Sequence, residues 1–592
     1  MRRIPFALVC ALAWGGTAFA ATFEAIGAGD MTDHDVILWT RATHDNGPVD
    51  VFAQVSTDPD FKQITWTGLG GTTAENNFTI KMNPGGLAAG TRYFYRFVAD
   101  TTSPVGRFTT VPAPDKAVAV TFGMTGDADG RFRPYPSIAG IERHELDFFI
   151  FNGDTIYETA SGKDPSVSPA VPRLFPDSSP AEATTALAAY YRKYRENILG
   201  VTEDGTAAMT GQQSLVPLFR VTGHYTLLDN HELGNAALQS GGAPLALRTS
   251  RSLPANPAQD ANATGTFHNR SVAFQTLEKA FFDYHSTRAD IAGSPTAGLR
   301  ITGPKVEAPD DPRSHGTARN YLAQRWGRNV LYVQLDDRSY RDARLGNATG
   351  GELPATDPRT ANPARTILGQ TQLLWLKRTL LGARESGVTW IFIAISSPID
   401  MVGGPPDGQH QDQKSWYGGY RAERNALLRF IADNKLEHVV FLATDDHMAR
   451  MTRLQYDPGD GTKALVPGAF QIVSGPIGAE GPDWFNEHDY ATILARITPR
   501  IDSQVAMGQP PDGLVGLPGL MNVRRDFHPD ADTKRDPIDF LSPDTFNYAV
   551  LSVDTSGVLR VSVFGIPSYA ANRNFTAPAE PEHEILSFQV KP

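Results

Sequence analysis

The first part of the chain, from Thr22 to about Pro112, alternates short apolar runs with turn residues. Alternation with a period of two indicates strands with one buried face, and several short strands at close spacing predict a small antiparallel β-sandwich. The expected strands are Val36–Trp39, Val49–Val55, Phe78–Met82 and Arg92–Val98. The segment Val111–Pro114 follows and is typical of a linker. We therefore place an N-terminal all-β domain at residues 22–112.

After this linker, nearly continuous apolar runs alternate with helical periodicity. Such runs predict strands buried on both faces, and their alternation with helices indicates layered α/β packing. The expected strands are Val118–Met124, Phe148–Phe151, Val330–Leu335, Trp390–Ile395 and Val439–Ala443, followed by closing strands at Tyr548–Val553, Val558–Phe564 and Ile585–Val590. The expected helices are Ala181–Asn197, Val272–Tyr284, Gly369–Leu381 and Tyr420–Asp433. Residues 115–592 are thus predicted to form a second domain of the α/β (α+β) class.

Length and composition agree with this division. A chain of 592 residues is too long for one ordinary hydrophobic core, and 41% hydrophobic with 20% charged residues is the composition of a folded protein. The formal net charge is −11 and no dense run of Lys and Arg occurs, which argues against a nucleic-acid partner or an anionic membrane surface. An anionic ligand would therefore need a local cation, such as a bound metal ion.

The N-terminal segment Met1–Ala21 has the three parts of a secretory signal. Two arginines precede an apolar stretch, Ile4–Trp14, and Thr17–Ala20 supplies a small-residue cleavage site that ends at Ala20. The alternative is a buried N-terminal strand or helix. We expect a secreted or periplasmic protein, exported by either the Sec or the twin-arginine route.

The only cysteine of the chain, Cys10, lies inside this signal segment. The mature protein would have no thiol, which excludes disulfides and thiolate metal ligands. No later segment has enough consecutive apolar residues to span a bilayer, so no transmembrane anchor is expected.

Three of the predicted buried strands end in carboxylate-rich turns, and a fourth polar turn follows the β-like run Tyr225–Leu228. The turns are Gly126–Gly130, Asn152–Glu158, Leu228–Glu232 and Ala443–His447. Ligands in layered α/β folds gather beyond the carboxyl ends of strands, so we expect these Asp, Asn and His side chains to converge. Each turn alone could be an ordinary surface turn. Together they predict a site for two cations, which can share a carboxylate and lower the pKa of a bridging water.

These motifs and their order resemble metallophosphoesterases of the alkaline phosphatase D type, within the calcineurin-like phosphoesterase superfamily. The most specific strings are Gly153–Glu158, with the sequence Gly-Asp-Thr-Ile-Tyr-Glu, and Asp229–Glu232, with the sequence Asp-Asn-His-Glu. Further matching segments are Leu87–Phe97, Gly106–Thr110, Leu335–Arg341, Trp416 with Tyr420 and Arg424, and Thr444–His447. The resemblance extends from about Phe23 to Val590 and covers nearly the whole mature chain.

The resemblance implies a four-layer metallophosphoesterase sandwich of two mixed β-sheets flanked by helices, preceded by a small immunoglobulin- or fibronectin-like β-sandwich. It also implies metal ligands at Asp127, Asp129, Asp154, Tyr157, Asn230, Asp445 and His447. Asp154 would bridge two metals, and Asn230 would bind one of them. Tyr157 matches a tyrosine that coordinates ferric iron in some relatives. His231 would be the general acid or would orient the phosphate, so Asp154 and His231 are the expected catalytic residues.

The sequence departs from the family pattern at one point. Some relatives have a cysteine just after the first strand of the second domain as an iron ligand, whereas this chain has Thr125 near that position. Oxygen-rich ligation with one or two imidazoles suits several ions. Two or more metal ions are expected, and their identity stays open among Ca²⁺, Mn²⁺, Fe³⁺ and Zn²⁺.

Three of the candidate residues have an ordinary structural alternative. Asp129 could cap the following turn, and Tyr157 could be a packed aromatic residue at the base of its loop. Arg338 could bind the phosphate of a substrate through bidentate hydrogen bonds. An arginine after a buried strand more often pairs with carboxylates, here Asp336 or Asp337.

The expected function is that of a secreted phosphoesterase, in which metal-activated hydroxide attacks phosphorus in line without a covalent phosphoenzyme. The substrate would be a phosphate monoester, a phosphate diester or a phospholipid, and the motifs do not choose among them. The nearest alternative is a phospholipase D-like phosphodiesterase. An alternative of another class is an inactive secreted binding protein. A serine hydrolase is disfavoured, because no Gly-x-Ser-x-Gly motif occurs.

Overall fold

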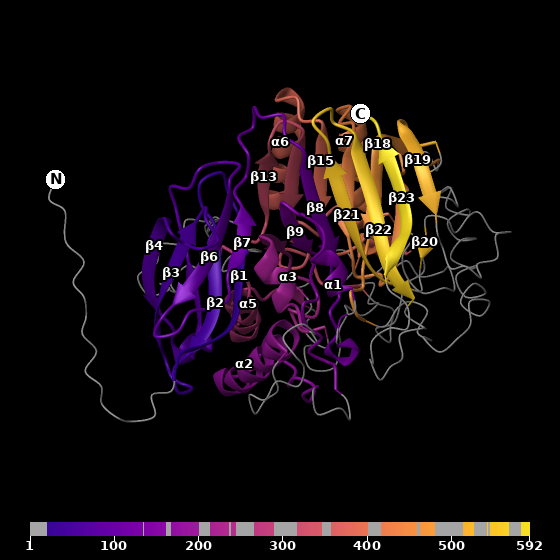
Figure 1. Cartoon of the computed structure of the whole chain (residues 1–592). Coiled ribbons are helices and arrows are strands. Elements are labelled where there is room, and N and C mark those ends of the chain that lie inside the picture. The colour runs from indigo at the N-terminus through magenta and orange to yellow at the C-terminus, as the bar shows by residue number, and fades with distance from the viewer. Residues whose placement is uncertain are drawn as a thin grey trace, which may run out of the picture.

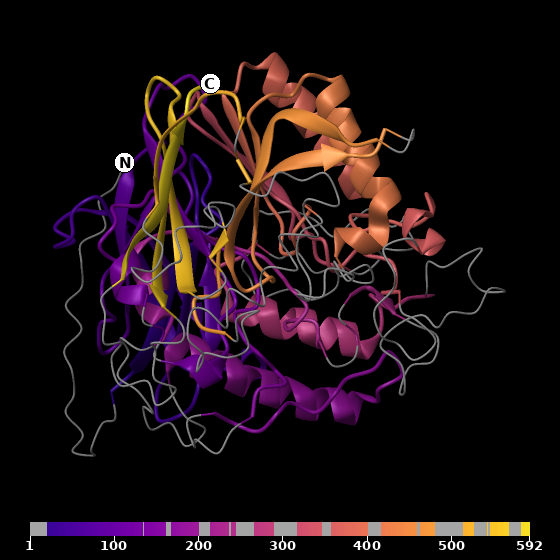
Figure 2. The same ribbon diagram turned by 90° about the vertical axis from the view of Figure 1, so that its right-hand side faces the viewer.

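The computed structural model describes residues 20–592 apart from 134, 136, 162–166, 201–213, 236–237, 239, 244–265, 289–316, 346–356, 401–415, 459–461, 480–512, 515, 526–540, 543–544 and 568–581. The expected signal segment therefore lies outside the described residues, except for its last two positions. The described residues form two large β-sheets packed face to face, with helices on the outer sides (Figure 1 and Figure 2).

The first sheet has ten strands in the order β19-β23-β22-β21-β8-β9-β10-β1-β2-β5. Its strands are β1 (Thr22–Gly29), β2 (Ile37–Thr43), β5 (Thr79–Met82), β8 (Val120–Thr125), β9 (Phe148–Phe151), β10 (His224–Thr226), β19 (Leu520–Arg525), β21 (Thr545–Val553), β22 (Leu559–Pro567) and β23 (His583–Val590). The central strands β8, β9, β10 and β1 are parallel, and their outer neighbours β21 and β2 are antiparallel to them. The sheet is therefore mixed.

The second sheet has seven strands in the order β13-β14-β15-β16-β18-β17-β20. Its strands are β13 (Leu322–Trp326), β14 (Val330–Gln334), β15 (Trp390–Ala394), β16 (Val439–Ala443), β17 (Ala449–Tyr456), β18 (Ala464–Val473) and β20 (Leu541–Ser542). Strands β14, β15, β16 and β18 are parallel, whereas β13 and β17 are antiparallel to their neighbours. The two mixed sheets that the resemblance implied are confirmed.

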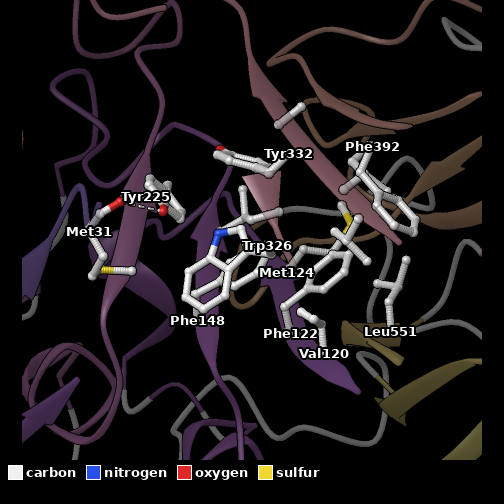
Figure 3. Packing of buried hydrophobic residues seen from close by; sticks show 14 of the residues in the cluster. Met31, Val120, Phe122, Met124, Phe148, Tyr225, Trp326, Tyr332, Phe392 and Leu551 are labelled. Carbon is white, nitrogen blue, oxygen red and sulfur yellow. Dashed lines mark hydrogen bonds between the residues drawn. The ribbon is translucent and has the colours of Figure 1, made fainter. Parts of the chain in front are cut away.

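Aromatic side chains from both sheets fill the space between them (Figure 3). Phe122 and Phe148 of the first sheet stack with ring centroids 4.7 Å apart. Phe392 of the second sheet meets Phe122 edge-on at 5.0 Å, and Trp326 packs on Phe148 at 4.6 Å. Large buried rings of this kind contribute much of the apolar area of a core. They fix how the strand ends of the two sheets face each other.

Helices cover the outer face of each sheet. They are α2 (Pro180–Tyr194) and α5 (Val272–Tyr284) on the first sheet, and α6 (Gln370–Glu385) and α7 (Arg421–Asp433) on the second. Along β9, Phe148 and Ile150 join the core between the sheets, whereas Phe149 and Phe151 belong to the cluster under α2 and α5. This strand is buried on both faces, which explains its uninterrupted apolar sequence. The predicted four layers are confirmed.

Most predicted elements lie at or near their expected positions. The main difference is the helix predicted at Ala181–Asn197, because α2 ends at Tyr194 and continues as the π-helical segment η3 (Arg195–Leu199). Shorter elements are α1 (Ile138–Ile141), α3 (Val216–Val221), β11 (Gly242–Ala243), β12 (Thr266–Phe267), η1 (Ala74–Asn76), η2 (Gly130–Phe132), η5 (Pro358–Ala361) and η6 (Tyr417–Tyr420). Among the described helices, none has the length and apolar character needed to cross a membrane.

A third sheet, in the order β4-β3-β6-β7, packs on β1, β2 and β5 of the first sheet. Its strands are β3 (Asp50–Ser56), β4 (Ile64–Gly71), β6 (Arg92–Val98) and β7 (Gly106–Thr109). β1 joins β10 at Gly29, where an added Cβ would lie 2.4 Å from the carbonyl oxygen of Ser286. An N-terminal all-β region is confirmed, but it shares a sheet with the rest of the fold, and an independent immunoglobulin-type sandwich is not confirmed. The division at residues 22–112 and 115–592 stays a prediction.

Candidate active site

The predicted ligand turns follow β8, β9, β10 and β16, where the ends of the two large sheets meet. The backbone N–H of Asp445 donates to Oδ2 of Asp127 at 3.3 Å. The hydroxyl of Thr444 donates to the carbonyl oxygen of Asn152 at 3.0 Å. These bonds join the turn after β16, in the second sheet, to the turns after β8 and β9 in the first. The structure therefore brings together turns that are about 300 residues apart in the chain.

Three carboxylates form the centre of this region: Asp127, Asp154 and Asp229. All three are buried, and each offers an oxygen within 4.8 Å of those of the other two. Burial is the main cause that raises the pKa of each carboxyl well above its ordinary value. Neighbouring negative charges increase this rise in pKa, since Asp445 raises the pKa of Asp127 and Asp229 raises that of Asp154. We call these three residues the carboxylate trio.

The buried guanidinium of Arg338 pairs with two carboxylates of this region. Its Nε lies 2.5 Å from Oδ1 of Asp229, and an Nη lies 2.6 Å from Oδ2 of Asp445. Oδ1 of Asp127 and Oδ2 of Asp229 are buried and accept no hydrogen bond from the described residues. A buried carboxylate oxygen without a donor is costly, and one arginine cannot balance the trio. Hard cations, which prefer oxygen ligands, fit this donor set.

His447 and Tyr157 lie beside the trio. Nε2 of His447 lies 3.6 Å from Oδ1 of Asp127 and 2.8 Å from the phenol oxygen of Tyr157. Burial, followed by the charge of Asp154, raises the pKa of the Tyr157 phenol well above its ordinary value. The ring of Tyr157 also packs on the imidazole of His231, with centroids 4.0 Å apart. Its position is therefore compatible with both sequence-based interpretations, a metal ligand and a packed aromatic residue.

His231 faces the trio from the turn after β10. Its Nδ1 lies 2.5 Å from Oε2 of Glu158, and its Nε2 lies 4.0 Å from Oδ2 of Asp154. The backbone N–H of His231 donates to Oδ1 of Asp154 at 3.1 Å. Glu158 therefore fixes the orientation of the ring. The half-buried Asn230 precedes His231, and its backbone N–H donates to Oδ1 of Asp229 at 2.7 Å.

The buried Glu232 joins two of the turns. Its carboxylate accepts the backbone N–H groups of Asp154 at 3.0 Å and Thr155 at 2.6 Å. It also accepts the backbone N–H of Asp229 at 2.9 Å. One side chain thus holds the turns after β9 and β10 at a fixed separation.

The ligand turns have an uncommon backbone conformation. Four non-glycine residues have positive φ angles, namely Asp127 (59°), Asp154 (52°), Asp445 (65°) and His447 (50°). Non-glycine residues seldom adopt this region, although Asp and Asn tolerate it better than most. Such conformations persist only where the surrounding structure supports them, and they are concentrated at functional sites. Asparagine is therefore expected to preserve these turns better than alanine where one of these aspartates is replaced.

A sequence profile of the PhoD-like phosphatase family matches residues 119–506, more than half of the chain. The chain belongs to this family. A second profile, that of the PhoD-like phosphatase N-terminal domain, matches residues 17–112. The membership makes this PhoD-like phosphatase a phosphoric ester hydrolase and confirms the resemblance to the alkaline phosphatase D type.

Individual relatives agree with this assignment. Alkaline phosphatase D of Bacillus subtilis (strain 168) is 24% identical over 477 residues, which are 77% of this chain and 70% of the relative. A solved structure of PhoD matches with a TM-score of 0.61 and 18% identity over 97% of this chain and 93% of that chain. The structural likeness supports the α/β fold with its all-β N-terminal region.

In this PhoD-like phosphatase, Asp129 has the alternative role of a cap. Its Oδ1 accepts the backbone N–H of Arg131 at 2.9 Å and so caps η2. Its Oδ2 accepts Nε–H of Arg131 at 2.8 Å. Both oxygens therefore accept hydrogen bonds from one arginine, and the ligand role of Asp129 stays a prediction.

Replacing Asp129 by alanine is expected to leave metal content and activity unchanged. The loss of the cap should lower the free energy of unfolding by about 1 kcal/mol. The loss should not be larger, because the half-exposed Arg131 can be hydrated once its carboxylate partner is gone. Urea unfolding and elemental analysis of the purified variant measure the two effects. A variant that loses bound metal would place Asp129 in the ligand set.

Arg338 is only 1% exposed, and its contact with the phosphate of a substrate stays a prediction. It does pair with carboxylates, as the alternative interpretation held, but its partners are Asp229 and Asp445. Asp336 instead accepts the backbone N–H of Arg338 at 3.1 Å. Sequence proximity suggested the wrong partners, since the real ones come from other strands.

Several residues that hold or form the candidate site were not predicted from the sequence. Asp229 and Glu232 begin and end the Asp-Asn-His-Glu string, and Glu158 ends the Gly-Asp-Thr-Ile-Tyr-Glu string. The indole N–H of Trp416, also within a matching segment, donates to Oδ2 of Asp445 at 2.6 Å. These residues therefore lie within the motifs that were recognised in the sequence, but the motifs did not reveal the role of each residue.

Proposed function

We propose that this chain is a secreted metal-dependent phosphoesterase that hydrolyses phosphate monoesters, diesters or both. The observation that carries the proposal is the carboxylate trio, with its two buried oxygens that lack donors among the described residues. Cations beside the trio would offset its charge and attract an anionic phosphate despite the net charge of −11. The signal-like segment Met1–Ala21 supports export.

The metals would be held by residues of all four turns. We assign them to Asp127, Asp154, Asp229, Tyr157, Asn230, Asp445 and His447. When bound, two metals clamp phosphoryl oxygens and lower the pKa of water. Oxygen and imidazole donors without a thiol are compatible with Ca²⁺, Mn²⁺, Fe³⁺ and Zn²⁺. Elemental analysis of untreated protein would identify the ions and their stoichiometry.

His231 would provide the proton for the leaving group. Glu158 accepts a hydrogen bond from Nδ1, so the opposite ring nitrogen, Nε2, faces the trio. An imidazolium held in this way would donate its Nε2 proton to the alcohol oxygen as the P–O bond breaks. No side-chain nucleophile is required, since water supplies the incoming oxygen.

Replacing His231 by alanine is expected to slow hydrolysis of phenyl phosphate by about 10²- to 10⁴-fold, because phenolate needs a proton to leave. Hydrolysis of 2,4-dinitrophenyl phosphate should slow much less, since its leaving group is stable as an anion. Metal content should not change. Equal losses with both substrates would rule out the general-acid role and leave His231 as a residue that orients the phosphate.

The substrate class can be tested on the purified, metal-loaded protein. p-Nitrophenyl phosphate reports monoesterase activity, bis-p-nitrophenyl phosphate reports diesterase activity, and phosphatidylcholine reports phospholipase D-like activity. Hydrolysis of either nitrophenyl ester that stops on chelation supports the proposal. Metal-loaded protein that cleaves none of the three would contradict it and favour a secreted binding protein.

A further inference from the structure

The helix α2 ends in an uncommon way near the ligand turns. Beyond Tyr194 the chain continues as the π-helical segment η3, which ends at Leu199 and is followed by Gly200 with a φ of 70°. A π turn holds one residue more than an α turn, and such segments are rare and frequent at functional sites. The residues Glu196–Leu199 of this segment are all buried. The segment therefore enters the core instead of lying on the surface.

Asn197, within η3, contacts two of the ligand turns. It is 2% exposed, and its Nδ2 donates to the carbonyl oxygens of Ala128 at 2.6 Å and Thr155 at 3.0 Å. Ala128 directly follows Asp127 in the chain, and Thr155 directly follows Asp154. One amide therefore ties together the turns that carry two carboxylates of the trio.

This contact complements the other bonds of the same turns. The backbone N–H of Ala128 donates to the carbonyl oxygen of Asp154 at 2.8 Å, which places the turns side by side. Glu232 accepts the N–H groups of Asp154 and Thr155, whereas Asn197 donates to the carbonyl oxygen of Thr155. The peptide groups around Asp154 are thus held from both their N–H and their C=O sides. Its left-handed conformation needs such support.

We propose that Asn197 is a positioning residue of the metal centre, whose amide keeps the carboxylates of Asp127 and Asp154 at the spacing that the cations require. The inference rests on the proposed function, since it takes the trio to bind metal. Productive sites need ligands placed within about 0.5 Å. Residues that orient metal ligands typically contribute about 10- to 100-fold to metal affinity or activity.

The test compares the variant Asn197→Ala with the wild type after chelation, by equilibrium dialysis against Mn²⁺ and, in parallel, against Ca²⁺. The metal concentration at half saturation is expected to rise by about 10- to 100-fold in the variant. Hydrolysis of p-nitrophenyl phosphate should be lost at limiting Mn²⁺ and recover at excess Mn²⁺. A side chain that only stabilises the fold would lower the melting temperature without this rescue by metal.

Asn329 offers a matched control. It is 7% exposed, and its Nδ2 donates to the carbonyl oxygens of Asp554 at 3.2 Å and Thr555 at 3.3 Å. It precedes β14 and so lies at the amino end of that strand, whereas the ligand turns lie at the carboxyl ends. The variant Asn329→Ala loses the same kind of bonds, and its half-saturation concentrations and activity are expected to equal those of the wild type.

The inference is overturned if Asn197→Ala binds both metals like the wild type, or if Asn329→Ala weakens binding as strongly. If Asn197→Ala does not fold, Asn197→Asp is measured in the same way, because it keeps the size of the side chain and removes the N–H donors. A wild type that binds none of Ca²⁺, Mn²⁺, Fe³⁺ and Zn²⁺ overturns this inference together with the proposed function. A wild type that binds metal beside an unshifted variant overturns only the role of Asn197.

Discussion

The variant Asp154→Asn is expected to lose phosphoester hydrolysis by at least about 10⁴-fold, since metal ions supply several kcal/mol of transition-state stabilisation. Asp154 belongs to the carboxylate trio, and its Oδ2 lies 4.0 Å from Nε2 of His231. Asparagine keeps the size of the side chain and tolerates the φ of 52° at this position. The loss should therefore come from the missing charge and not from a distorted turn.

The same variant is expected to be more stable than the wild type when both are free of metal. Burial and the neighbouring Asp229 raise the pKa of Asp154, so its ionised form destabilises the folded state. A neutral amide removes this cost, and functional sites commonly sacrifice stability in this way. Scanning calorimetry with EDTA should show a higher melting temperature for Asp154→Asn, and added Mn²⁺ should raise it less than in the wild type.

A second substitution distinguishes the general effect of removing a buried negative charge from the loss of a metal ligand. The variant Asp129→Asn also replaces a buried carboxylate, but the contacts of Asp129 are with Arg131. It is expected to keep wild-type activity. Near-normal turnover of Asp154→Asn would remove Asp154 from the mechanism.

Sequence periodicity located the strands whose surroundings are uniformly apolar. The boundaries of β9 (Phe148–Phe151) and β16 (Val439–Ala443) agree with prediction, because both strands are buried on both faces. β17 was missed because a buried arginine interrupts its apolar pattern. Arg450 is 1% exposed, and its charge is balanced by Asp400 at 2.8 Å. Periodicity assumes that inward positions are apolar, so an internal ion pair conceals a strand.

The pairing of strands that are far apart in the chain could also not be predicted from the sequence. The N-terminal strands were expected to form their own sandwich, whereas β1 pairs with β10, a strand far along the chain, through Gly29 and His224. Local patterns predict strands and not their neighbours. A glycine that allows the close approach of another backbone gives no signal of which backbone it is.

The candidate site could be located from sequence because each turn follows a strand, and strand ends of parallel sheets gather at one edge. Individual roles depended on the direction of each side chain. In the string Asp229–Glu232, the carboxylate of Asp229 joins the trio, the ring of His231 contacts Glu158, and the carboxylate of Glu232 accepts backbone N–H groups. The resemblance selected Asn230 and His231, whereas the structure adds Asp229 to the trio and assigns Glu232 to the backbone of the turns.

Asn197 shows the limit of motif-based analysis. It lies outside every matching string and was expected to end an ordinary helix. Its contacts with Ala128 and Thr155 exist only because α2 widens into a π-helical segment beside the turns. Residues that orient ligands are recognisable only after the turns they hold have been placed in space.

Removal of the metals is expected to abolish activity and to make the stability of the fold fall as pH rises. The folded-state pKa of Asp127, Asp154 and Asp229 is raised above the ordinary value of 3.8, chiefly by burial. The folded protein therefore binds more protons than the unfolded chain above pH 3.8. The stabilisation that these three carboxyl groups contribute is complete below pH 3.8, where both states are protonated. It is lost as pH rises through the raised pKa values of the folded state. A tenfold difference in the proton affinity of one carboxylate between the folded and unfolded states corresponds to about 1.4 kcal/mol.

Bound cations should replace these protons and remove the dependence of stability on pH. Calorimetry between about pH 5 and pH 9 is expected to show a falling melting temperature with EDTA and a flatter profile with saturating metal. At a free metal concentration about 1,000 times its Kd, one bound ion stabilises the folded state by about 4 kcal/mol. The variant Asp154→Asn provides the control, because it lacks one titrating carboxyl and should have a shallower slope with EDTA. Parallel profiles with and without metal would show that the trio is not the metal site, since only cations bound at these carboxylates would cancel their titration.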